Sequence, residues 1–171
     1  MIKKPTYSIE SDYFANYVNK AIGTDLIASL EENLMDTQEL YQTLIGRKES
    51  YQYAKGKWTV KQVLQHLIDT ERVFAYRALR MARQDKTALA GYDEDDFAAN
   101  DNTSNRSLAD IITEFHQVRM ATISLFDSFS NDSLDFEAEA INTSFTPRII
   151  GWLLCGHVEH HNNVIKERYL N

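Results

Sequence analysis

Apolar residues recur every three or four positions in four long segments of the chain, the spacing that places them on one face of an α-helix. These segments cover residues 26–45, 60–83, 108–129 and 147–165. At 1.5 Å per residue, these segments would form helices about 30–35 Å long. Four amphipathic helices of matched length favour an all-α fold, and we predict a four-helix bundle.

Helix start signals precede each of the four segments. A residue at the N-terminal cap accepts a hydrogen bond from a free backbone N–H, so Ser, Thr and Asp are typical there. The cap candidates are Thr24, Thr59 with Gln62, Ser107 with Asp110, and Thr146 followed by Pro147. Gly46 follows the first segment and is typical of a helix end. The caps therefore predict the same helices as the periodicity.

The rest of the chain predicts one short helix and two long connections. Residues 7–21 are aromatic-rich and weakly periodic, and we expect them to form a short extra N-terminal helix across one end of the bundle. The connections at 90–105 and 130–146 are longer than those usual in bundles. The acidic run at 93–96 lacks the spacing of a calcium-binding loop, so we expect a solvated loop there.

Composition narrows the class of protein. With 171 residues the chain fits a single domain, residues 1–171, and its formal net charge of −7 argues against nucleic acid as a partner. Its one cysteine, Cys155, excludes an internal disulfide and indicates a reducing compartment. The sequence has neither an apolar run of membrane-spanning length nor a signal-peptide pattern. We therefore expect a soluble cytoplasmic protein without a membrane partner.

Three of the five histidines crowd the last segment. At about 100° per residue, His157 and His161 lie about 40° apart on its apolar face, whereas His160 lies about 60° away at the flank. Two imidazoles one turn apart on an inward face are a common half-site for a transition metal. We therefore prefer His157 and His161 as a ligand pair, with hydrogen-bonded histidines that bind no metal as the alternative.

A third ligand has to come from another helix. His66 is the best candidate, because it shares a face of the 60–83 segment with Thr70 and Arg77, and that face is too polar for plain core. His116 borders the apolar face of the 108–129 segment and ranks below His66. From spacing alone, both remain candidates for the third position.

The sequence lacks several well-defined catalytic and metal-binding motifs. A zincin peptidase needs His-Glu-x-x-His, but Glu159 follows His157 by two residues and lies about 200° around the helix. No histidine has Glu three residues before it, which excludes a ferritin-like di-iron site. Gly151 and Gly156 have the spacing of a phosphate loop, but His157 stands where that loop requires Lys. Cys155 lies about 160° from His157, so we expect it to face away from the pair.

Charged residues near these histidines have two possible roles. Arg77 and Arg119 lie where a simple core would be apolar, and a buried guanidinium needs a partner. We favour internal pairing, with contact to an anionic group of a substrate as the alternative. Asp69 lies about 60° from His66 and is a candidate hydrogen-bond partner of that ligand, whereas Glu71 should point elsewhere. His160 is a further candidate for contact with a substrate.

A resemblance to the DinB-like superfamily, in particular to its YfiT-like branch, rests on three segments: YAKGKWTVKQVLQHLIDTERVFAYRALRMAR, GYDEDDF and GWLLCGHVEHHNNVIKERYL. The likeness runs from Tyr13 to Asn171 and implies a four-helix bundle. It also implies that His66, His157 and His161 bind one divalent metal ion, usually zinc or nickel. Homodimers are frequent in that superfamily, so a homodimer is a further expectation.

Three neutral histidines would leave coordination positions open, which is typical of a catalytic rather than a structural metal site. The resemblance implies transfer of a low-molecular-weight thiol, as in bacillithiol- or mycothiol-dependent members, and we favour such an S-transferase acting on a small molecule. A hydrolase that uses a metal-activated water is the first alternative. A non-enzymatic metal-binding stress-response module is the second. In the transferase, Arg77 or Arg119 would hold a carboxylate of the thiol or of its acceptor.

Overall fold

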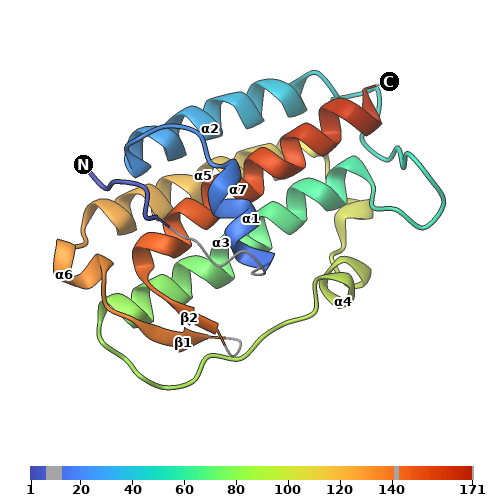
Figure 1. Ribbon diagram of the computed structural model, residues 1–171. Helices are drawn as coiled ribbons and strands as arrows, with labels where there is room; N and C mark the ends of the chain where they lie inside the picture. The colour runs from blue at the N-terminus through green and yellow to red at the C-terminus, as the bar shows by residue number, and fades with distance from the viewer. Residues whose placement is uncertain (7–12, 141–142, 171) are drawn as a thin grey trace.

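The computed structural model describes residues 1–6, 13–140 and 143–170. Four long helices dominate it, one in each segment that the periodicity predicts: α2 (Leu26–Gln42), α3 (Val60–Ala82), α5 (Leu108–Asp127) and α7 (Pro147–Val164). The predicted all-α four-helix bundle is therefore confirmed (Figure 1). No helix in the described part of the chain is both long and apolar enough to cross a bilayer.

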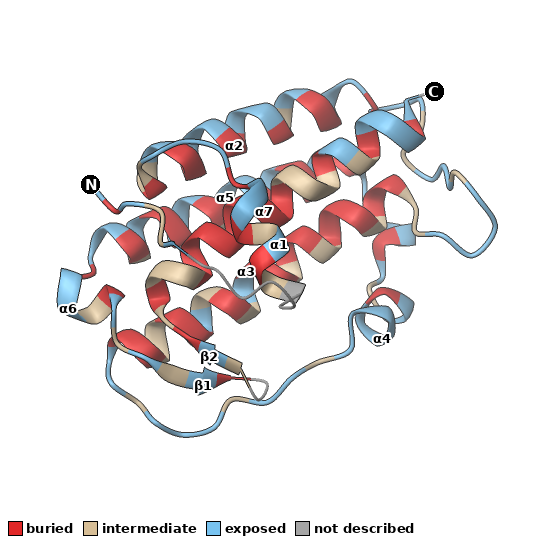
Figure 2. Ribbon diagram, in the orientation of Figure 1, coloured by how far each residue is buried: buried red, intermediate tan, exposed pale blue. Residues whose placement is uncertain are grey.

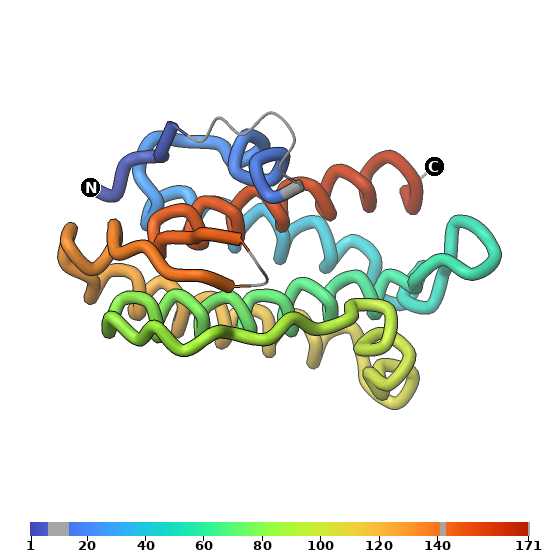
Figure 3. Tube along the Cα trace, turned by 60° about the horizontal axis from the view of Figure 1, so that its bottom comes forward, coloured from blue at the N-terminus to red at the C-terminus, as the bar shows by residue number. Residues whose placement is uncertain are grey.

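The helices are not arranged in a simple up-and-down order. Both α2 and α3 pack against α5 and α7, so the consecutive helices α2 and α3 occupy opposite corners of the bundle. Figure 1 shows that α2 and α7 run in one direction and that α3 and α5 run in the other. The chain must therefore return along the whole bundle between α3 and α5 (Figure 3), which explains the length of that connection.

Three of the four predicted helix starts are confirmed. The Thr59 hydroxyl accepts a hydrogen bond from the Gln62 N–H, while the Gln62 side chain accepts one from the Thr59 N–H, as a capping box requires. Ser107 caps α5. Thr146 caps α7, with Pro147 at the first helical position.

Both ends of α2 differ from the prediction. Its cap is Asp25 rather than Thr24, because the Asp25 carboxylate accepts hydrogen bonds from the backbone N–H of α2 and from that of Ile2. The helix stops at Gln42, before the predicted end, and the chain then turns through Gly46 with a φ of +68°. Asp25 is itself a typical cap residue, and its second hydrogen bond ties the N-terminal segment to the start of α2.

The N-terminal helix α1 (Tyr13–Lys20) packs against α7 and crosses it near its middle (Figure 1), and does not lie across one end of the bundle. Gly156 permits this close approach, since a Cβ at that position would lie 1.7 Å from the carbonyl oxygen of Tyr17. The predicted location of this helix was wrong, and residues 7–12 of the prediction lie outside the described residues. The crossing at Gly156 brings α1 next to His157.

The two long connections contain short elements that the sequence did not predict: α4 (Glu94–Ala99), η1 (Thr103–Asn105), α6 (Asn131–Leu134), β1 (Ala138–Ala140) and β2 (Thr143–Phe145). The two strands pair antiparallel, with Ala138 opposite Phe145. Three-residue strands are too short to produce a readable alternation. The acidic run is exposed, as expected, but it is not a loop: Asp93 caps α4, and the three acidic residues after it form the first turn of that helix, where negative charge is favourable. Beyond α7, the π-helix η2 (Ile165–Tyr169) extends the chain.

Buried residues line the inside of the bundle (Figure 2) and form two apolar clusters. One is centred on Phe126, Phe145 and Trp152, and the other on Leu64 and Phe115. Every long helix contributes a buried polar residue where its side chains change from one cluster to the other: Asn33, Glu71, Arg119 and His157. A polar layer therefore separates the two halves of the core.

Candidate metal centre

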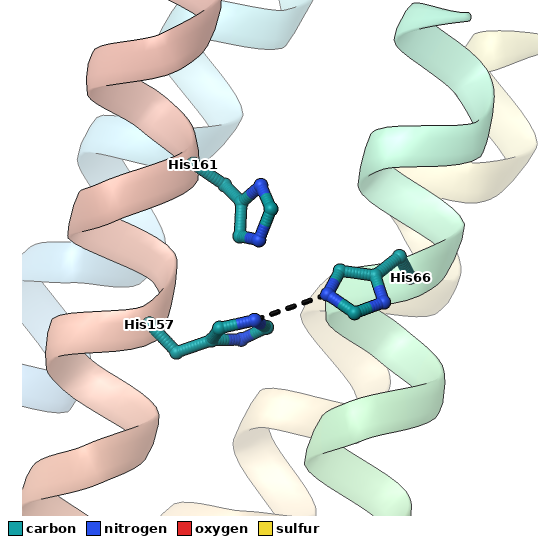
Figure 4. Close-up of side chains that lie close together, drawn as sticks. All are labelled: His66, His157 and His161. Carbon is teal, nitrogen blue, oxygen red and sulfur yellow. Dashed lines mark hydrogen bonds between the residues drawn. The ribbon is translucent and has the colours of Figure 1, made fainter. Parts of the chain in front are cut away.

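The three histidines that the resemblance selected come together between α3 and α7. The rings of His157 and His161 lie 4.6 Å apart on α7, and His66 reaches from α3 to within 4.9 Å of each ring (Figure 4). The Nε2 atoms of His66 and His157 are 3.0 Å apart. One ring nitrogen from each histidine lies within 4.8 Å of the other two. Three imidazole nitrogens grouped in this way are a ligand set that zinc uses, with bonds of about 2.0–2.1 Å.

Aromatic neighbours hold two of the imidazoles in place. Trp58, which precedes the cap of α3, lies over His66 with 4.7 Å between the ring centroids. Tyr17 of α1 meets the ring of His157 edge-on at 5.2 Å. These contacts limit the rotation of the rings, so the site is largely formed by the apoprotein.

Burial keeps the three imidazoles neutral. It lowers the pKa of His66 to about 4. Burial also lowers the pKa of His157 and of His161 well below the usual value, and the neighbouring imidazoles add to the effect. A neutral imidazole has a free lone pair, which is the form that binds a metal ion. These nitrogen donors fit a borderline divalent ion such as zinc or nickel.

A cavity of about 390 Å³ opens beside the three histidines. Its volume is at the lower end of the range for small-molecule sites. The aromatic part of its wall is formed by Phe14, Tyr17, Trp58, Phe74 and Tyr92. Among the described residues that line it, Glu94 is the one carboxylate, and none is Lys or Arg. The cavity is therefore mainly apolar, with the histidines as its main polar wall.

Two parts of this wall were missed by the sequence reasoning. Tyr17 comes from α1, which was expected elsewhere, and Tyr92 comes from the long crossover between α3 and α5. The Tyr92 hydroxyl lies 2.8 Å from the Oγ1 of Thr70, a buried polar residue on the His66 face of α3. The unusual length of the crossover was the signal, because long loops in a compact domain often cover a site.

The two remaining histidines lie outside the cluster of three. His160 lines the cavity and contacts Tyr17, with 5.5 Å between the ring centroids, but it is not among the three grouped nitrogens. His116 is exposed on α5, where its Nδ1 lies 3.3 Å from the Oε1 of Gln38. The structure therefore places His66, and not His116, beside the pair on α7.

Arg119 is paired inside the protein. Its guanidinium donates to both carboxylate oxygens of Glu71, with a shortest distance of 2.8 Å, and also to the Leu30 carbonyl and the Asn33 side chain. Both Arg119 and Glu71 are almost fully buried. Neither lines the histidine cavity, so Arg119 has the internal partner that the sequence analysis favoured.

Arg77 and Asp69 also lie close to the site without lining the main cavity. Arg77 donates a 2.8 Å hydrogen bond to the carbonyl of Ala90 and lies over the ring of Phe74. It thereby fastens the crossover segment that carries Tyr92. Asp69 accepts a 2.9 Å hydrogen bond from Gln65, and burial raises its pKa.

Cys155 is buried and does not line the histidine cavity. Burial raises the pKa of its thiol to about 12, so the thiol stays protonated at neutral pH. The helical spacing predicts that this cysteine faces away from the histidine pair.

The fold and the site define a helical-bundle protein with three clustered histidines beside a small-molecule-sized cavity. The sequence profile of the DinB superfamily matches residues 29–165, and the chain belongs to this superfamily. A similar solved structure is YfiT from Bacillus subtilis, described as "a probable metal-dependent hydrolase with an unusual four-helix bundle topology". The two chains are 18% identical, with a TM-score of 0.75 over 98% of this chain and 91% of that one. None of the curated proteins matches this sequence.

Proposed function

We propose that His66, His157 and His161 bind one divalent metal ion, zinc or nickel, and that the protein transfers a low-molecular-weight thiol to a small electrophile. The observation that carries the proposal is the cluster of three neutral imidazoles on the wall of a cavity. When bound there, the ion would supply Lewis acidity, which lowers the pKa of a thiol or a water beside it.

The apolar lining of the cavity and the acidity of thiols both support thiol transfer. The aromatic side chains of Phe14, Phe74 and Tyr17 line the cavity, and an apolar lining would favour a desolvated, more reactive sulfur. A thiol loses its proton more readily than water, so its ionisation needs less help from a neighbouring base. The proton passes to solvent, the sulfur forms a bond to the electrophilic carbon, and the leaving group departs.

Hydrolysis is the second candidate, and Glu94 is the observation that favours it. Glu94 lines the cavity and is the one carboxylate among its described lining residues, and a carboxylate can act as a general base for water. The description of YfiT as a metal-dependent hydrolase points the same way. Glu94 is exposed on α4, however, so water competes for its carboxylate.

Metal content and activity test the proposal together. We expect one equivalent of metal in the purified protein and in His116→Ala, and less than about a tenth of it in His66→Ala, His157→Ala and His161→Ala. His116→Ala is the matched control, since it removes a histidine that lies outside the cluster. Full metal in His157→Ala and His161→Ala, with loss in His160→Ala, would show that the ligand assignment is wrong.

The reaction is tested with the metal-loaded protein, a set of small thiols and a chlorinated nitroarene. We expect metal-dependent formation of the thioether, and only background formation with His66→Ala. Background rates with every thiol, together with cleavage of an ester that is lost in Glu94→Gln, would favour the hydrolase instead.

A further inference from the structure

A second cavity adjoins the first. It has a volume of about 380 Å³, close to that of the first. Trp58, His160 and His161 line both cavities, so the cavities are neighbours at these three side chains. Two molecules, one in each cavity, would therefore both lie beside His161, one of the three clustered histidines.

The walls of the second cavity are rigid and largely aromatic. Tyr53 and Tyr169 meet edge-to-face, with 5.0 Å between their ring centroids. The Tyr169 hydroxyl donates a 2.7 Å hydrogen bond to the carbonyl oxygen of Trp58, so its polar atom already has a partner. Val63 and Val164 supply the aliphatic part of the wall. These rings and aliphatic groups offer stacking and dispersion contacts to a ligand.

The charged groups of the second cavity lie at its mouth. Lys57 and Asp95 line it and both are exposed, so their opposite charges are solvated and select no net charge in a ligand. The cavity therefore suits a flat, uncharged and unsaturated molecule better than a charged one. The first cavity differs, because all three clustered histidines line it, whereas the second reaches only His161 of the three.

We propose that the second cavity binds the electrophilic acceptor, a molecule with a planar aromatic ring, while the thiol occupies the first cavity. This inference rests on the proposed thiol transfer. For an aryl chloride, the sulfur electron pair forms the carbon–sulfur bond, chloride leaves with the electrons of the carbon–chlorine bond, and the thiol proton passes to solvent. Val164 and Tyr53 are then specificity-determining residues for the acceptor.

Methyl NMR of the full-length, metal-loaded protein tests the site with 1,3-dinitrobenzene. This probe has no leaving group, so binding is observed without reaction. We expect ring-current shifts at the methyl groups of Val63 and Val164, which line the second cavity, and unchanged methyl signals from Leu153, which lines the first. Shifts at Leu153 alone, or no shifts up to the solubility limit of the probe, would overturn the proposal.

The second measurement uses a variant in which a larger side chain fills the second cavity. Val164→Phe should weaken binding of the probe by about tenfold or more, and should raise the KM for the arene without changing the KM for the thiol. Met120→Phe, a similar enlargement at an exposed position on α5, should leave both unchanged. Equal probe affinity in the two variants contradicts the proposed site.

The two proposals fail in different ways. Methyl shifts at Val63 and Val164 without any thioether formation would contradict thiol transfer and leave the arene site standing. Thioether formation with a KM for the arene that Val164→Phe does not change would contradict the arene site alone.

Discussion

Two groups of buried polar side chains meet in the middle of the bundle, and they differ in what their polar atoms contact. In the Arg119 network, the guanidinium donates to Glu71 and Asn33, and the Thr37 hydroxyl links the Asn33 carbonyl to the Asn162 amide. In the histidine cluster, the imidazoles face one another and an open cavity. The network has internal partners and the cluster has space for a ligand, so the first is expected to stabilise the fold and the second to bind.

Breaking the network should have the largest effect on stability. Arg119→Met leaves the Glu71 carboxylate buried without a cation, so the free energy of unfolding should fall by about 3–5 kcal/mol. Urea denaturation followed by circular dichroism measures this. The double variant Glu71→Leu with Arg119→Met removes both charges and should regain part of the loss. A loss below about 1 kcal/mol in the single variant would contradict a structural role for the pair.

Binding of a metal ion to the histidine cluster should have the next largest effect on the free energy of unfolding. A metal at 100 times its dissociation constant should raise the free energy of unfolding by about 2.7 kcal/mol, because it binds only the folded state. His157→Ala should gain nothing, and His116→Ala should gain as much as the natural sequence. Denaturation with and without zinc measures the difference.

Metal removal should nevertheless leave the fold intact. The two apolar clusters do not depend on the histidines, so the far-ultraviolet helical signal should persist after chelation at room temperature. Loss of that signal would show that the fold depends on metal binding at the histidine cluster. It would then be wrong that the Arg119 network stabilises the fold while the histidine cluster only binds a ligand.

Two helix caps can be compared in the same way, because only one of the two helices carries a proposed metal ligand. Thr59 caps α3, which carries His66 in its second turn, whereas Ser107 caps α5, which carries no proposed ligand. Thr59→Ala and Ser107→Ala should each lower the free energy of unfolding by about 1 kcal/mol. Only Thr59→Ala should also weaken zinc binding in a competition titration, because fraying of the first turn of α3 reaches His66. Equal zinc affinity in both variants would contradict this coupling.

The histidine cluster was easier to predict than the rest of its surroundings. The i, i+4 spacing of His157 and His161 indicates a shared face without knowledge of the fold, because helix geometry alone sets it. The choice of His66 over His116 needed the family resemblance as well as the polar face of its helix. Tyr17 and Tyr92, by contrast, reach the cavity through the docking of α1 and the path of the crossover, and neither follows from local spacing.

The Arg119 network could be predicted only in part. The position of Arg119 in an apolar stripe indicated a buried guanidinium that needs a partner. Its actual partner, Glu71, was expected only to point away from His66, and nothing in the sequence joined α3 to α5. Which helices are neighbours depends on the order of helices around the bundle, which periodicity does not encode.

The smallest expected effect is at the surface of the same α3–α5 seam, where Glu114 binds Arg72 at 2.6 Å and also pairs with Arg106. Burial acts to raise the pKa of Glu114, but hydrogen bonds from the two arginines outweigh it and hold the pKa below the usual value of 4.5. A lowered pKa means that the pair stabilises the fold above about pH 4.5 and that this contribution is lost as the pH falls further. Arg72→Ala should therefore cost less than about 1 kcal/mol at pH 7, since Arg72 is half-exposed, and less at pH 3 than at pH 7. Urea denaturation at both pH values measures the difference, and a cost as large as that of Arg119→Met would remove the contrast between buried and exposed pairs.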